Sequence, residues 1–111
     1  MKKISLNEVL EQPVSHNPEI AKRVFLAAGA IPGLTNLSQA VVKAGQKADR
    51  HTHQDMYEVF VVRHGSGVIE VDDERHPLQC DDCVVIEPGE SHEISNPNQE
   101  DLVLLYFGLL Q

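Results

Sequence analysis

The stretch that decides the fold runs from residue 45 to residue 58 and reads GQKADRHTHQDMYE. Successive side chains of a strand point to opposite faces, so we expect His51 and His53 to share one face and Thr52 to lie on the other. Two imidazoles on one face can bind the same metal ion. Glu58 follows His53 by five residues, and this odd interval would put its carboxylate on the wrong face of an unbroken strand.

A bend or bulge is therefore expected between the histidines and Glu58, at the polar pair Gln54–Asp55. Beyond it the chain alternates, with Glu58 on the same face as the apolar Phe60 and Val62. The pattern predicts a carboxylate that points into an apolar interior. An ionised carboxylate in such a place costs several kcal/mol unless it is paired or coordinated, and a metal ion is the simplest partner.

His92 supplies a further imidazole downstream. It follows the turn signal Pro88-Gly89 and opens a short segment in which Ile94 and Asn96 share its face. Three imidazoles and one carboxylate suit Fe(II), Mn(II), Ni(II), Co(II), Zn(II) or Cu(II) better than Mg or Ca, and the residues do not choose among these six. We expect one divalent transition metal ion per chain. Its predicted ligands are His51, His53, Glu58 and His92.

Residues 45–65 fill every position of the pattern G-x5-H-x-H-x4-E-x6-G and so resemble the first motif of the cupin superfamily. Residues 81–96 resemble the second motif, G-x5-P-x-G-x2-H-x3-N, with three of its five positions kept and two replaced. The kept positions are Gly89, His92 and Asn96, and the replaced ones are Asp81 and Glu87. The resemblance to a small single-domain cupin implies an all-β double-stranded β-helix, or jelly roll, with the same four metal ligands. It also implies a homodimer.

Size and charge restrict the function. The 111 residues form one domain, residues 1–111, and the net charge of -8 arises from 17 acidic and 9 basic residues. Long-range repulsion makes nucleic acid an unlikely partner by this reasoning. No run of eighteen apolar residues exists, so we expect no membrane association and a cytoplasmic protein. Cys80 and Cys83 are expected to be reduced thiols of no special function.

Short strands separated by turn residues favour a barrel or sandwich. A capping-box pattern at Ser5 predicts a short N-terminal helix over residues 6–11. Strands are expected at residues 22–27, 37–43, 56–63, 68–71, 75–78, 84–87, 93–96 and 102–108. The chain between the second and third of these is expected to be a loop that presents His51 and His53.

Other polar residues have simpler interpretations. His16, His64 and His76 lie in apparent turns or polar stretches and are expected to be solvated. Asp49, Arg50 and Asp55 are expected to pair with one another at the surface. Four residues are weak candidates for the cavity wall, because alternation does not show which face of their strands looks inward. They are Gln39, Phe60, Asn96 and Tyr106.

Four ligands around an ion that accepts six leave up to two positions for water, dioxygen or substrate. The first hypothesis is a dioxygenase or other oxygenase acting on a small organic molecule, in which Glu58 is a ligand throughout or acts as a base. The second is a metal-dependent isomerase, decarboxylase or hydrolase. The third is a non-catalytic binder of small molecules. Basic residues near the first ligand pair are limited to Lys47 and Arg50, so we expect a neutral or weakly acidic substrate.

Overall fold

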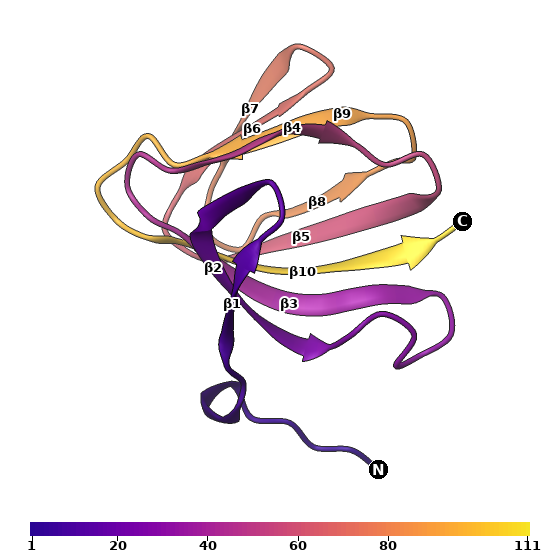
Figure 1. The fold of residues 1–111 in the computed structure, drawn as a ribbon. Helices are drawn as coiled ribbons and strands as arrows, with labels where there is room; N and C mark the ends of the chain where they lie inside the picture. The colour runs from indigo at the N-terminus through magenta and orange to yellow at the C-terminus, as the bar shows by residue number, and fades with distance from the viewer.

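The computed structural model describes residues 1–111 and consists of two antiparallel β-sheets that face each other (Figure 1). One sheet has six strands. In spatial order they are β1 (Glu11–Val14), β2 (Asn17–Leu26), β3 (Leu34–Val42), β10 (Leu102–Leu110), β5 (Met56–His64) and β8 (Cys83–Ile86). The other sheet has four strands. They are β4 (Lys47–Thr52), β9 (Ser91–Ser95), β6 (Gly67–Val71) and β7 (Glu74–Leu78). This arrangement is the expected jelly roll.

The hydrophobic core lies between the two sheets and follows the alternation of the strands. On β5, Glu58, Phe60 and Val62 are buried while the residues between them are more exposed. On β9 and just beyond it, His92 and Asn96 are each 1% exposed, so the predicted inward face is confirmed. Eleven apolar residues form the core. They are Ile20, Ala40, Val42, Phe60, Val62, Ile69, Leu78, Ile86, Ile94, Leu102 and Leu104.

The expected bend between His53 and Glu58 is a crossing from one sheet to the other. β4 ends at Thr52 in the four-stranded sheet, and β5 begins at Met56 in the six-stranded sheet. His53 lies in the connection, so its side chain is not bound by the alternation of either strand. The odd interval is resolved because His51 and Glu58 belong to opposite sheets that face the same interior, and His53 turns toward that interior from the connection between them.

The N-terminal helix was predicted too long. Only a single 3-10 turn, Leu6–Glu8, forms, and the side chain of Ser5 caps nothing. β1 follows at Glu11 as an edge strand, where Pro13 is tolerated because it needs no ladder hydrogen bond on its open side. The strand expected from the spacing of His51 and His53 is found at His51, on β4, and the expected loop is found only at His53. No helix of the structure has the length and apolar character needed to cross a bilayer.

Candidate metal centre

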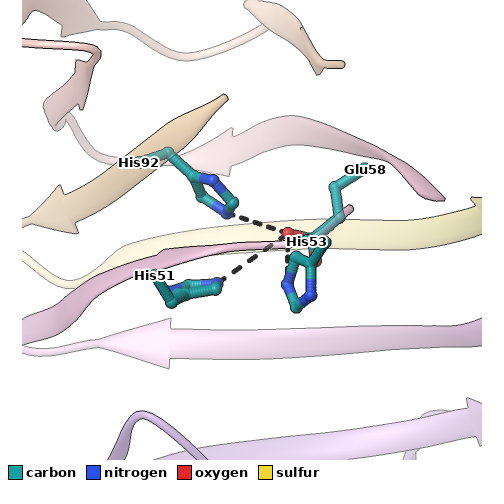
Figure 2. A group of neighbouring side chains, drawn as sticks. All are labelled: His51, His53, Glu58 and His92. Atoms are coloured by element: carbon teal, nitrogen blue, oxygen red, sulfur yellow. Dashed lines mark hydrogen bonds and ion pairs between the residues drawn. The ribbon is translucent and has the colours of Figure 1, made fainter. Parts of the chain in front are cut away.

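The four predicted ligands converge on one point inside the barrel (Figure 2). Oε1 of Glu58 lies 2.9 Å from Nε2 of His92, 3.3 Å from Nε2 of His53 and 3.9 Å from Nε2 of His51. One ligand atom from each residue lies within 4.8 Å of the other three. Two donors on opposite sides of an ion, each about 2.1 Å from it, are about 4.2 Å apart, so the cluster needs little adjustment to hold a metal.

Strand pairing explains the position of two of the imidazoles. β4 and β9 are neighbours, and their register places His51 directly opposite His92. The ring centroids of this pair are 4.2 Å apart. Glu58 approaches from β5 in the facing sheet, as Figure 2 shows. The site therefore depends on the closure of the two sheets, since neither sheet holds all the ligands.

Backbone carbonyls orient two of the rings. Nδ1 of His51 donates to the carbonyl oxygen of Asp49 over 2.8 Å, and Nδ1 of His92 donates to that of Glu90 over 3.2 Å. With the proton at Nδ1, the lone pair of Nε2 points to the common centre. The Nε2 atom of His92 also lies 2.9 Å from Oε1 of Glu58, a contact of two lone pairs that needs a proton or another cation between them. A cation at Nε2 satisfies this arrangement as well as a proton does, and the residues fit a metal ion.

The electrostatics of the cluster favour metal binding. Burial lowers the pKa of His51 to about 4, so this imidazole is neutral at physiological pH and ready to coordinate. Burial raises the pKa of Glu58, but its hydrogen bond with His92 and the charges of the three histidines outweigh this, and the net pKa is lowered. Glu58 is 6% exposed and ionised, and it contacts only imidazoles. A buried carboxylate beside imidazole nitrogen donors attracts a divalent cation.

The ligands open onto a cavity of about 170 Å³ whose wall is mostly apolar. Of the four weak candidates for this wall, Phe60 and Tyr106 line it, with their rings stacked at 5.5 Å. Gln39 does not line it. Asn96 is also absent from it, because its buried amide donates to the carbonyl oxygens of Val42 and Glu100. Burial raises the pKa of Tyr106 to about 12, so its hydroxyl stays protonated.

Two basic side chains are among the cavity residues that sequence reasoning missed. His16, expected to be solvated, instead stacks on the ring of His51 at 3.6 Å and 12° between planes. It reaches the cavity because the turn between β1 and β2 folds over the opening, held by the bond from the side-chain amide of Asn17 to the carbonyl of Lys47. Lys22 on β2 also lines the cavity. Lys22 shares a strand face with the apolar Ile20, two residues before it, and this spacing was the signal that could have placed it in the interior.

The other charged and histidine residues considered in the sequence analysis lie outside the cavity. His64 and His76 are more than half exposed, as expected. Arg50 pairs with Glu70 at 3.1 Å and Asp73 at 3.8 Å, so its expected pairing with Asp49 and Asp55 is wrong. The direction of the side chain explains why the expected partners were wrong, because β4 places Arg50 on the outer side of its sheet. Cys80 and Cys83 are both exposed free thiols.

The model of the Cupin domain family matches residues 38–108, which include all four ligands. The chain belongs to the cupin family. The cupin fold is also shown by the crystal structure of a predicted oxalate decarboxylase from Thermotoga maritima, with a TM-score of 0.92 over 99% of this cupin and 100% of that chain, at 21% identity.

Two curated relatives are similar over part of the cupin. An uncharacterized protein of Methanocaldococcus jannaschii is 29% identical over 70 residues, which are 63% of this chain and 56% of that protein. An oxidoreductase of Arthrobotrys oligospora is 35% identical over 65 residues, which are 57% of this chain and 26% of that protein. The matched region thus spans about half of one relative and a quarter of the other.

Proposed function

We propose that this cupin is a metal-dependent enzyme that acts on a small organic molecule, and that its reaction is an oxygenation. The supporting observation is a cluster of three histidines and one glutamate, drawn together from opposite sheets, that opens onto a small, mostly apolar cavity. The 170 Å³ of this cavity is below the roughly 300–1,000 Å³ typical of sites for drug-sized ligands, so the substrate is compact. Similarity to a protein named oxidoreductase agrees with redox chemistry.

His51, His53, His92 and Glu58 would hold the metal. When bound, the metal would supply Lewis-acid activation of the substrate and, where its oxidation state can change, the electrons for dioxygen chemistry. The protein holds the ligand atoms in place beforehand, through the backbone carbonyls that orient His51 and His92. Preorganised ligands need little rearrangement when metal and substrate bind.

The cavity wall has its own part in the reaction. Phe60, Ile94 and Leu104 exclude bulk water from the region beside the ligands. Tyr106 and Asn36 provide neutral polar groups in the same wall, and Tyr106 keeps its proton to donate to a substrate oxygen. Glu58 is ionised but its low pKa makes it a weak base, so we assign it to metal binding first.

A second candidate reaction is decarboxylation or isomerisation without redox change. The full-length structural similarity to a predicted oxalate decarboxylase is the observation that favours it. The identity of the native metal separates the two, because zinc supports Lewis-acid chemistry alone whereas iron, manganese or copper supports both.

Metal analysis of natively purified protein, combined with an oxygen electrode, tests the proposal. We expect about one transition metal ion per chain and oxygen uptake that depends on an added small oxygen-bearing compound. His51→Ala and His92→Ala should lose the metal, while His64→Ala, the same change at an exposed histidine, should keep it. Turnover without oxygen uptake would favour the second reaction, and a protein that retains no transition metal would contradict both.

A further inference from the structure

The cavity holds one basic side chain besides the histidines, and its position is unusual for a lysine. Lys22 lies on β2 and shares its inward face with Ile20, which is 1% exposed. Its neighbour across the register is Ala40, also buried, whose small side chain leaves room for the lysine stem. Lys22 is half-buried and lines the cavity together with the metal ligands.

Lys22 has no counter-charge in the protein. It forms no ion pair in the structure, whereas Arg23, Lys47 and Arg50 each pair with a carboxylate. The only carboxylate of the cavity wall is Glu58, which is engaged by three imidazoles. Lys22 is only half-buried and its ammonium is partly hydrated, so an anion that enters the cavity can pair with it without first breaking an internal ion pair.

Charge and geometry together describe that ligand. With a divalent ion bound, the charges of the ion, Glu58 and Lys22 sum to +2. The cavity is then positively charged in an otherwise acidic protein. In the sheet, β2 is separated from β5 by β3 and β10, so the strands of Lys22 and Glu58 are about 14 Å apart at about 4.8 Å per step. The register also places Lys22, through Ala40 and Leu104, level with Val62, four residues along β5 from Glu58. Lys22 and Glu58 therefore border different parts of the cavity, and one small group does not bridge both.

We propose that Lys22 binds the distal carboxylate of a short, bifunctional organic acid whose other end chelates the metal through oxygen atoms. This assignment rests on the proposed metal-dependent function of the site. It replaces the neutral or weakly acidic substrate expected from Lys47 and Arg50, because those two side chains pair with acidic residues and do not line the cavity.

Cobalt-loaded protein provides a test that requires no turnover. The visible spectrum of bound Co(II) reports chelation, and it is followed while malate or 2-hydroxyglutarate is added, each compared with the monoacid of equal chain length that ends in a methyl group. Both members of a pair present the same chelating end and differ only at the distal end. We expect at least one diacid to bind about tenfold or more tightly than its monoacid, as befits one charge-assisted hydrogen bond.

Lys22→Met should remove this preference and leave monoacid affinity within about twofold, and Lys22→Arg should restore most of it. Lys43→Met, at an exposed lysine just beyond β3, is the matched control and should behave as the unmodified protein. Equal binding of both members of every pair, or equal weakening of both by Lys22→Met, would overturn the assignment of Lys22. Failure to bind cobalt at one ion per chain would instead overturn the metal site on which it rests.

Discussion

At the scale of single residues, the decisive one is Glu58. Its carboxylate is 6% exposed and lies within 3.9 Å of all three ligand histidines. The spacing of residues 51, 53, 58 and 92 predicted this cluster correctly. His16 and Lys22 were not predicted as cavity residues, because a turn and a β2 side chain reach the cavity only through folding of distant segments.

Replacing Glu58 by glutamine should weaken metal binding without unfolding the protein. The amide has the same shape but lacks the charge that attracts the cation, so we expect affinity to fall by about tenfold or more. Competition with a coloured chelator measures the change. Glu8→Gln, in the exposed 3-10 turn, is the control. Unchanged affinity in Glu58→Gln would show that the carboxylate is not a ligand.

Tyr106 should make the protein sensitive to alkali. Burial raises its pKa to about 12 from an ordinary value of about 10. Between these values the folded chain keeps a proton that the unfolded chain releases, so the stabilisation from Tyr106 is complete below pH 10 and is lost as pH rises to about 12. Denaturant unfolding across this range should show a steeper loss than in Tyr106→Phe. If the unfolding free energies of the two proteins fell in parallel with pH, the raised pKa of Tyr106 would be contradicted.

At the scale of elements, most strands follow from alternation and turn residues. β5 and β10 are rich in apolar residues, with three valines in β5 and aromatic residues in both, and were predicted nearly to their ends. β1 and β4 were missed because both are polar and short of β-branched residues. They form because neighbouring strands pair with them, so tertiary pairing outweighs their weak local preference for strand structure.

The turn between β5 and β6 should tolerate no side chain at Gly65. Gly65 has a φ of +75°, and a Cβ there would overlap the backbone carbonyl of Asp101. Gly29 has a similar φ of +82° but open space around it. We expect Gly29→Ala to lower the free energy of unfolding by about 1 kcal/mol, as measured by urea denaturation. Gly65→Ala should lower it by about 2 kcal/mol more than Gly29→Ala does. Equal losses in the two variants would show that the positive φ alone sets the cost, and that the overlap with Asp101 adds nothing.

At the scale of the whole molecule, the central strands β10 and β5 of the six-stranded sheet are apolar on their outer face as well as on their inner one. Leu105, Phe107 and Leu109 of β10 point outward, beside Val61, Val59 and Tyr57 of β5. An antiparallel sheet of a monomer normally has a polar outer face. Contiguous exposed apolar surface of this kind marks an interaction site, which agrees with the homodimer expected from the family resemblance.

Sedimentation should therefore give a dimer, and Leu105→Glu should give a monomer because it places a charge in the centre of the outer face. The substitution is on the side of the sheet away from the cavity, so metal content should not change. Leu10→Glu, at a site that is 85% exposed and outside this face, should remain dimeric. A monomeric unmodified protein would contradict the prediction, and a dimeric Leu105→Glu would place the interface elsewhere.

Local spacing was enough to predict a barrel or sandwich, the inward faces of β5 and β9, and the convergence of His51, His53, Glu58 and His92, because these depend on alternation within short segments and on turn residues beside them. The jelly roll itself was predicted from the family resemblance. The contents of the cavity depended on the closed barrel. Which face of β2 looks inward, and where the β1–β2 turn lies, are decided by packing between strands far apart in the chain. For that reason only the tertiary structure placed His16 against His51 and Lys22 in the wall of the same cavity.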